Sequence, residues 1–127
     1  MQFKDKKAIY KQIADKITDN ILSRRWLEEE RIPSVREMAV DMEVNPNTIA
    51  RTYGYLQDQQ IINNKRGIGY FVTPNAVKLA IESKRQDFIK KELPLFFRSL
   101  DLLSIDLNRI KTLYKEYHTT GDKNENK

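Results

Sequence analysis

The sequence predicts a mainly α-helical fold with one small β-hairpin. Through most of the 127 residues, apolar side chains recur at spacings of three and four, which is the period of an amphipathic helix. Residues 61–73 depart from this period, because β-branched and aromatic residues flank a glycine-containing turn. A chain of this length can form a small domain with an appended helical element. We therefore expect a domain over residues 1–74, a helical element over 75–118 and a disordered polar tail over 119–127.

The composition excludes several classes of function. There is no cysteine, which removes disulfides, thiolate metal sites and thiol nucleophiles. The single histidine, His118, lies near a polar C-terminus without clustered carboxylates, so neither a metal site nor a cofactor is predicted. No apolar run approaches the ~18 residues of a membrane span and no signal peptide is visible, so we expect a soluble cytoplasmic protein. The net charge of +5 permits a polyanionic partner.

The first helix is predicted over residues 8–22. Its apolar stripe consists of isoleucines at steps of four, namely Ile9, Ile13, Ile17 and Ile21. The mixed charges that follow, in SRRWLEEER, have no period and predict a loop, with Trp26 folded back onto the core.

Start and stop signals predict a second, short helix. Pro33 disfavours a helical residue before it, and Ser34 is a favourable N-cap. Glu37, three residues after Ser34, completes a capping box. The helix should therefore begin at Val35, and its apolar period ends at Glu43.

A third helix is predicted directly afterwards, with Asn45 as its N-cap and Pro46 at its first position. It should continue to about Gln59, with an apolar back face made of Ile49, Tyr53 and Leu56. Its first turn holds only short polar side chains. Taken alone, such a turn is an ordinary helix cap.

Two short helices joined by a tight turn form a helix-turn-helix pattern, and a basic hairpin after them predicts a winged helix. A helix docked end-on into the major groove of DNA contacts base edges with its N-terminal residues, which accounts for a polar first turn. Asn47 can pair with adenine, Thr48 can reach a phosphate or a thymine methyl group, and Arg51 can reach phosphate or guanine. At the hairpin tip, Lys65 and Arg66 form either a solubilising turn or, behind a helix-turn-helix, a DNA contact.

Beyond Pro74 the helical period returns, and Pro94 divides it into two predicted helices. The second carries a seam with a/d spacing from Phe96 to Tyr117, which is typical of a coiled-coil-like face. Such a face packs either inside one chain or against a second copy, and we favour a homodimer because the N-terminal domain already has its own core. The predicted dimerisation residues are Phe88, Phe96, Leu100, Leu103, Leu107, Ile110 and Tyr114.

The chain contains, in this order, the segments YKQIADKI, RIPSVREMA, VNPNTIARTYGYLQDQQII and KRGIGYFV. Together they resemble the DNA-binding domain of the GntR family of bacterial transcription regulators, over residues 8–73. The ARTY segment and the short helical C-terminal part are similar to the YtrA-like subfamily. The resemblance implies that Arg36 at the start of the second helix, Asn45 in the polar turn and Gly67 at the wing tip also lie at the DNA. It further implies dimerisation through two C-terminal helices and control of a nearby transporter operon.

Several positions depart from the family's pattern. In the loop before the second helix, Glu29 and Glu30 precede Ile32 where the family usually has Gly-Asp. Arg24 and Gln60 stand where the family often has glycine. Gly54 lies inside the predicted third helix, where it costs about 1 kcal/mol relative to alanine. None of these positions is a predicted DNA contact.

The sequence thus predicts a dimeric, sequence-specific DNA-binding regulator, in the simplest case a repressor of an inverted-repeat operator. No signature names a small-molecule effector. The alternative is a winged helix whose partner is another protein. An enzyme is disfavoured, because the carboxylates that could act as general acids or bases lie on predicted exposed helical faces without partners at catalytic spacing; they are Asp15, Asp19, Asp41 and Glu43.

Overall fold

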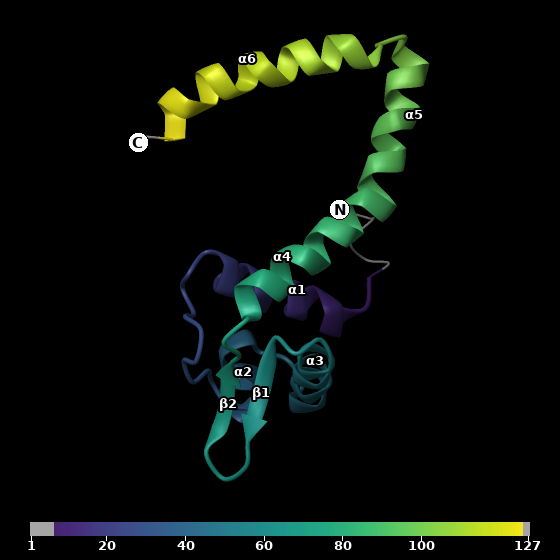
Figure 1. The fold of residues 1–127 in the computed structure, drawn as a ribbon. Coiled ribbons are helices and arrows are strands. Elements are labelled where there is room, and N and C mark those ends of the chain that lie inside the picture. The colour runs from purple at the N-terminus through teal and green to yellow at the C-terminus, as the bar shows by residue number, and fades with distance from the viewer. Residues whose placement is uncertain (1–6, 126–127) are drawn as a thin grey trace. The chain divides into compact units, whose positions relative to one another are not determined.

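The computed structural model describes residues 7–125, with side chains up to residue 120, and divides into an N-terminal unit, residues 1–84, and a C-terminal unit, residues 85–127. The N-terminal unit contains α1 (Ile9–Leu22), α2 (Val35–Met42), α3 (Pro46–Asp58), β1 (Ile62–Lys65), β2 (Gly69–Val72) and the first turns of α4 (Ala76–Asp87) (Figure 1). The C-terminal unit continues with the π-helical segment η2 (Phe88–Glu92), α5 (Leu93–Leu103) and α6 (Leu107–Glu125). The predicted mainly α-helical fold with one hairpin is confirmed.

The core of the N-terminal unit lies where α1, α2, α3 and the hairpin meet. Ile17 and Ile21 of α1 and Ile49 of α3 are buried at its centre, as the helical period predicts. Ile9 differs from the prediction: it is the first residue of α1 and remains exposed. Trp26 packs against the core from the loop after α1, as predicted.

Helix α2 begins with the predicted capping box. The Glu37 backbone N–H donates to Ser34 Oγ at 3.1 Å, and the Ser34 N–H donates to Glu37 Oε1 at 2.9 Å. The hydrogen bond from the Ser34 backbone, followed by that with its hydroxyl, lowers the pKa of the Glu37 carboxyl. The helix ends at Glu43, whose φ of 57° closes the turn before α3. The helix-turn-helix therefore has the predicted boundaries.

The antiparallel hairpin pairs Ile62 with Val72 and Lys65 with Gly69. The segment before α2 lies along the other edge of β2, where Arg31 forms an isolated bridge to Phe71. The Ile32 N–H donates to the Tyr70 carbonyl at 2.9 Å, and the Val72 N–H donates to the Glu30 carbonyl at 2.9 Å. The hairpin is thus held from one side by the chain that leads into α2.

Tyr53 connects α3 to both neighbouring elements. Its ring is fully buried and meets the ring of Tyr70 edge to face at 4.8 Å. Its hydroxyl donates to the Pro33 carbonyl at 2.7 Å, which satisfies the one polar atom of the side chain. Burial raises the pKa of Tyr53 above its ordinary value. One residue therefore fixes α3 against the wing and against the start of α2.

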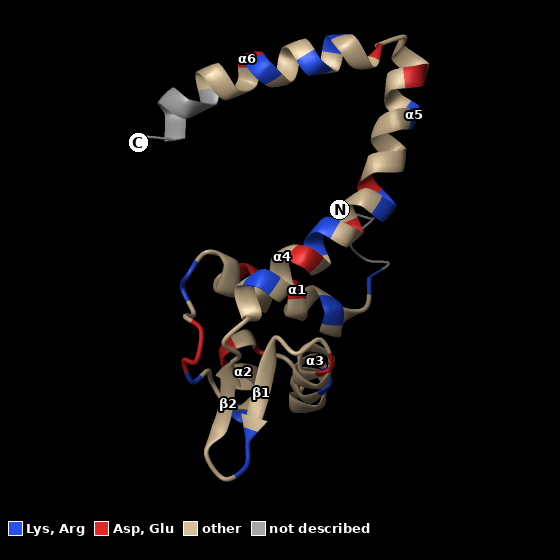
Figure 2. Ribbon diagram, viewed as in Figure 1, with Lys and Arg blue, Asp and Glu red and all other residues tan. Residues whose placement is uncertain are grey.

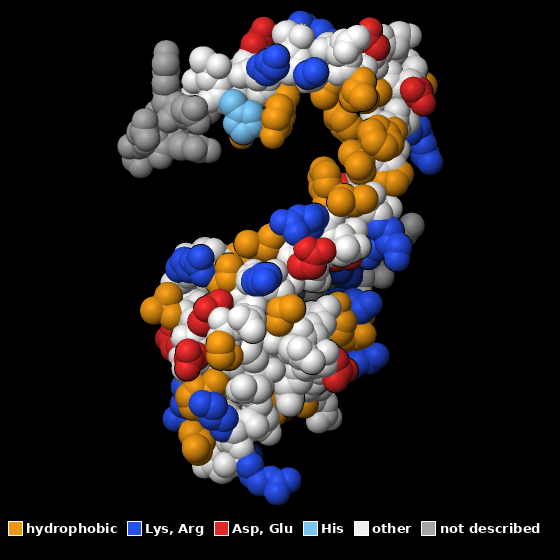
Figure 3. Space-filling view, in the orientation of Figure 1, with side chains coloured by type: hydrophobic (Ala, Val, Ile, Leu, Met, Phe, Trp, Pro, Cys, Tyr) orange, Lys and Arg blue, Asp and Glu red, His pale blue; other side chains and the backbone are white. Residues whose placement is uncertain are grey.

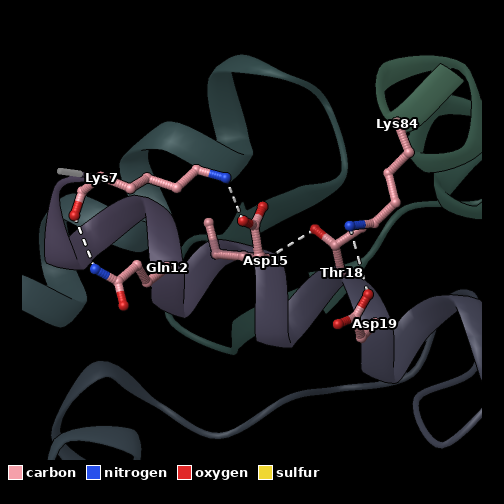
Figure 4. Close-up of polar contacts among 7 residues, drawn as sticks. Lys7, Gln12, Asp15, Thr18, Asp19 and Lys84 are labelled. Atoms are coloured by element: carbon pink, nitrogen blue, oxygen red, sulfur yellow. Dashed lines mark hydrogen bonds and ion pairs between the residues drawn. The ribbon is translucent and has the colours of Figure 1, made fainter. Parts of the chain in front are cut away.

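Polar contacts line α1, and one of them attaches α4 to it (Figure 4). Lys7 pairs with Asp15, and Lys84 of α4 pairs with Asp19 at 3.5 Å. Ala76 and Ala80 of α4 are fully buried in the N-terminal core. The compact unit therefore extends to residue 84, whereas the sequence placed its boundary at 74.

The predicted helix break at Pro94 is wrong. Pro94 lies in the first turn of α5, which directly follows η2, so the helical path continues through it. A π-helical segment before a proline accommodates the missing N–H without ending the helix. The break lies instead after Leu103, where Ser104 has a φ of 55° and Asp106 Oδ1 accepts from the Arg109 N–H at 2.9 Å.

Because of this break, part of the predicted seam lies on α5 and part on α6. The seam is therefore not one straight coiled-coil face. Most of its side chains are nevertheless exposed, Leu103 by 67% and Tyr114 by 62%. Leu100 is buried and Ile110 is half-buried. Apolar side chains gather along α5 and the adjoining part of α6 (Figure 3). The C-terminal unit therefore carries a large apolar surface that its own residues leave uncovered.

The sequence predicts a disordered tail over 119–127, whereas α6 continues to Glu125. Residues 126–127 lie outside the described part of the chain. Within the described residues, no helix is both long enough and apolar enough to cross a membrane.

Replacing Gln60 by glycine is expected to raise the free energy of unfolding by about 0.5–1 kcal/mol. Gln60 has a φ of 63°, a left-handed conformation that is unfavourable for a residue with a Cβ atom and open to glycine. Urea unfolding followed by circular dichroism measures the change. Gln59→Gly is the matched control, because Gln59 has a φ of −84° and the same substitution there should lower stability. Equal effects at both positions would contradict the conformational explanation.

Candidate nucleic-acid interface

Helix α3 has two sharply different sides. Ile49, Tyr53 and Leu56 are each 0% exposed and form the back of the helix. Asn47 and Arg51, one turn apart, are exposed, and Thr48 between them is half-buried. The buried back face fixes the helix in the fold, so its first turn is presented to the outside on a rigid support.

Asn45 has a structural task in this turn. Its Oδ1 accepts from the Asn47 backbone N–H at 2.7 Å, so its oxygen is committed to capping α3. Its amide NH₂ group still provides donors, and the side chain is exposed. Of the predicted polar positions, Asn45 therefore shapes the helix end, while Asn47 and Thr48 keep their side-chain acceptors and donors for a partner.

Arg36 lies in the first turn of α2, directly after the Ser34 cap, and is exposed. It is therefore held on a capped helix in the same unit as α3. The two helix starts of the helix-turn-helix, together with the wing, hold all eight predicted DNA-binding residues: Arg36, Asn45, Asn47, Thr48, Arg51, Lys65, Arg66 and Gly67.

The guanidinium of Arg51 lies over the ring of Tyr10 in α1, with Cζ at 4.1 Å from the ring centroid. The face of an aromatic ring attracts a cationic guanidinium, whose five N–H donors lie at its edges. Arg51 was predictable as a candidate from the sequence, whereas Tyr10 was not. The contact joins two helices that are far apart in the chain, so the spacing of apolar residues within one helix cannot predict it.

The wing tip is the turn from Lys65 to Ile68, where the Ile68 N–H donates to the Lys65 carbonyl at 2.8 Å. Gly67 occupies the third position with a φ of 79°, the value that a type II turn requires there. Lys65 Nζ lies 4.3 Å from the centroid of the Phe71 ring, and Arg66 is exposed. Basic residues mark the tip of the hairpin, which projects beyond the helices of its unit (Figure 2).

Arg31 is a second cation that the sequence pattern did not indicate. It is exposed, and its backbone bridges to Phe71, so the residue belongs to the wing sheet rather than to a free loop. Its guanidinium lies over Gly69, the first residue of β2: a Cβ atom at Gly69 would lie 2.8 Å from Arg31 Nε. The positive surface of the wing therefore includes the segment before α2 as well as the hairpin tip.

Gly69→Ala is expected to destabilise the wing by about 1–3 kcal/mol. Gly69 has a φ of 144°, which is strained for alanine, and the new methyl group would displace the Arg31 side chain. Hydrogen exchange of the β1 and β2 amides, together with denaturant unfolding, measures the loss. Gly54→Ala is the control, because nothing lies within 4 Å of the position that its new Cβ atom would take and the α3 interior favours alanine. Unchanged exchange in the wing of Gly69→Ala would refute the expectation.

The acidic run in the loop between α1 and α2 (Figure 2) is tied to the fold. Glu28 Oε2 accepts from the Val77 N–H at the start of α4 at 3.1 Å. Glu30 Oε1 accepts from the Leu27 N–H at 2.7 Å. These carboxylates therefore stabilise a helix start and a turn, so residues of the predicted loop have structural roles.

The carboxylates considered for catalysis are not gathered into a site. Asp15 pairs with Lys7 and Asp19 pairs with Lys84 (Figure 4). Glu43 is the exposed C-cap of α2. Across residues 7–125, no cluster of histidine, aspartate and glutamate has the arrangement of a metal site.

The family pattern described as "Bacterial regulatory proteins, gntR family" matches residues 9–72, which span α1 to β2. The chain belongs to the GntR family. The match covers the helix-turn-helix and the wing, the parts that carry the candidate interface. GntR regulators act through a DNA-binding helix-turn-helix domain and are not enzymes, so the predicted family and the predicted absence of an enzyme activity are confirmed.

Two regulators from Bacillus subtilis are similar to this GntR chain. The HTH-type transcriptional regulator YhcF is 40% identical over 92 residues, covering 72% of this chain and 74% of YhcF. The HTH-type transcriptional repressor YtrA is 30% identical over 108 residues, covering 85% of this chain and 82% of YtrA. The second similarity extends beyond the winged helix into the C-terminal helices and confirms the YtrA-like subfamily.

Solved structures agree with this family assignment. A GntR-family transcriptional regulator from Bacteroides thetaiotaomicron is 47% identical, with a TM-score of 0.79, covering 90% of this chain and 99% of that one. A GntR-family regulator from Listeria monocytogenes is 35% identical with a TM-score of 0.68, covering 88% of this chain and 96% of that one. The winged helix with helical C-terminal elements is therefore an architecture that GntR regulators share.

Proposed function

We propose that this GntR regulator binds an inverted-repeat operator as a homodimer in the cytoplasm and represses transcription there. The observation that carries the proposal is the division of α3 into a fully buried back and an exposed polar first turn. A recognition helix needs this arrangement, because its N-terminal side chains contact base edges while the rest of the helix stays in the core.

The proposed roles follow from side-chain chemistry. Asn47 pairs with an adenine edge, Arg51 pairs with guanine, and Thr48 contacts a phosphate or a thymine methyl group. Arg36 lies at the start of the preceding helix and binds the DNA backbone. At the wing, Lys65 and Arg66 supply charge to the minor groove, and Gly67 allows the backbone to approach closely.

The uncovered apolar face of the C-terminal unit supports the homodimer. Soluble monomers rarely expose a large contiguous apolar patch, and a two-fold axis lets one face cover its own copy. The proposed contacts are the exposed members of the predicted set, Phe88, Phe96, Leu103, Leu107 and Tyr114, with Leu100 and Ile110 supporting them from beneath.

Two recognition helices related by a two-fold axis require two half-sites in inverted orientation. The name of the similar YtrA protein, a transcriptional repressor, supports repression, which a dimer achieves by occupying the promoter. Resemblance to this subfamily supports a nearby transporter operon as the target. A small-molecule effector of this regulator has no assigned site.

Fluorescence anisotropy on a labelled duplex from upstream of the gene tests the proposal, with a scrambled duplex as control and two salt concentrations. We expect tight binding to the first duplex, preference over the second, and affinity that falls steeply with salt. A variant with alanine at Asn47, Thr48 and Arg51 should lose the preference. Sequence-blind binding by the wild-type protein, repeated in a selection from random duplexes, would indicate instead a winged helix that serves a protein partner.

A further inference from the structure

Tyr10 lies at the centre of a small cluster between α1 and α3 that the proposed contacts do not include. Its ring carries the Arg51 guanidinium on its face, with Cζ at 4.1 Å from the centroid. It also packs edge to face with the Tyr55 ring, with the ring centroids 5.7 Å apart and an interplanar angle of 78°. Arg51 and Tyr55 are one turn apart on α3, so the Tyr10 ring contacts both of these side chains.

The backbone of Tyr10 is fixed to the same helix. Thr52, fully buried in α3, shares its one O–H between two carbonyls, that of Tyr10 at 3.1 Å and that of Thr48 at 2.9 Å from Oγ1. The start of α1 is therefore bound to α3 directly behind the exposed turn. The Tyr10 ring has little freedom to leave Arg51, because the ring packs against Tyr55 and its main chain is bound to α3.

We propose that Tyr10 is a positioning residue of the DNA interface, which holds the Arg51 guanidinium in one orientation before DNA arrives; this rests on the proposed function. An unrestrained arginine loses the freedom of several rotatable bonds when it pairs with a base. A guanidinium that stacks flat on an aromatic ring keeps its in-plane N–H donors for guanine. The ring thereby lowers the entropic cost of the contact without touching the DNA itself.

The proposal distinguishes the ring of Tyr10 from its hydroxyl. A phenylalanine ring can also carry a cation on its face, whereas an aliphatic side chain cannot. Tyr10→Phe should therefore keep operator affinity within about twofold of wild type, and Tyr10→Leu should weaken it about two- to fivefold. Binding to a scrambled duplex, which does not use the base contact of Arg51, should be unchanged in both variants.

A double-mutant cycle tests whether Tyr10 acts through Arg51. Anisotropy titrations compare wild type, Tyr10→Leu, Arg51→Ala and the double variant on operator and scrambled duplexes, at temperatures well below each melting point. In the Arg51→Ala background, Tyr10→Leu should change operator affinity by less than about 1.5-fold, because coupled residues are non-additive. A merely structural role of Tyr10 predicts the same loss in both backgrounds, and that result would overturn the proposal.

An NMR measurement on the protein without DNA complements the double-mutant cycle. The Arg51 side-chain protons should show upfield ring-current shifts in the NMR spectrum of the full chain, present in Tyr10→Phe and absent in Tyr10→Leu. Unshifted Arg51 protons in the wild-type protein, or an equal affinity loss in Tyr10→Phe and Tyr10→Leu, would overturn the positioning role. A wild-type protein with no operator preference would instead overturn the proposed function, and the first titration distinguishes the two failures.

Discussion

Replacing Arg51 by alanine is expected to weaken binding to the operator by about 1–3 kcal/mol, roughly five- to 150-fold, and to leave binding to scrambled DNA nearly unchanged. Arg51 is exposed in α3 and its guanidinium lies over the Tyr10 ring, where it can form a paired contact with guanine. Without that contact, the protein no longer distinguishes the bases at this position of the operator. Specificity at that base pair should relax in a selection from random duplexes.

Arg66→Ala is the matched control, because it removes the same side chain from the wing tip instead of from the recognition helix. Arg66 is exposed in a turn, and nothing there fixes its side chain to select a base. We therefore expect it to interact with the negatively charged phosphates of any DNA sequence. Operator and scrambled DNA should lose affinity equally, and the slope of log K against log salt should fall by about one. If Arg51→Ala also weakened both duplexes equally, its role as a base reader would be refuted.

The helix-turn-helix could be predicted from sequence because local chemistry specifies it. The boundaries of α2 follow from the Ser34 and Glu37 capping box, and those of α3 from Asn45 and Pro46. Each signal lies within a few residues of the element that it defines. Arg24 and Gln60 both have left-handed backbone conformations, which glycine adopts readily. The backbone at these two positions is therefore the one that the family's usual glycine would favour.

The C-terminal helices are less predictable, because heptad spacing continues unchanged across a tight turn. Leu103 and Leu107 are four residues apart, and the pattern alone cannot distinguish one helix from two. The signal for the break is Asp106, an N-cap residue inside the apparent seam. Pro94 is a weak stop signal, since a proline in the first turn of a helix is tolerated.

Tyr10 and Arg31 escape prediction for a different reason. Each approaches the interface from an element far away in the chain, through a contact with Arg51 or Gly69 that no periodicity encodes. The sequence therefore predicts which side chains a DNA-binding helix presents, whereas the residues that hold them in place emerge only from tertiary packing.

Changing Leu103 and Leu107 to aspartate together is expected to convert the proposed dimer into a monomer. Both side chains are exposed within the chain, 67% and 66%, so neither substitution opens a cavity in the protomer. In a dimer, the same positions would bury two unpaired charges on each copy, which is strongly unfavourable. Sedimentation equilibrium should show a mass near twice 15.0 kDa for wild type and near 15.0 kDa for the variant.

Affinity for the inverted repeat should fall about 100-fold or more in this variant, although no DNA contact has changed. In the dimer, binding of one half-site holds the second recognition helix at a high effective concentration near the other, and a monomer loses this advantage. A duplex with a single half-site should bind wild type and variant with similar affinity. The comparison of the two duplexes therefore separates loss of dimerisation from damage to the winged helix.

Asn108→Asp is the control for added charge, because it introduces a carboxylate at an exposed polar position of α6 beside Leu107. It should remain dimeric and bind the inverted repeat as wild type does. If the double variant stayed dimeric, the two-fold axis would lie elsewhere on the chain. If it became monomeric and still bound the inverted repeat tightly, the protein would not need two coupled recognition helices, and the operator would have to be a single site. Either result would contradict the proposal that the C-terminal helices form a dimer on which operator binding by α3 depends.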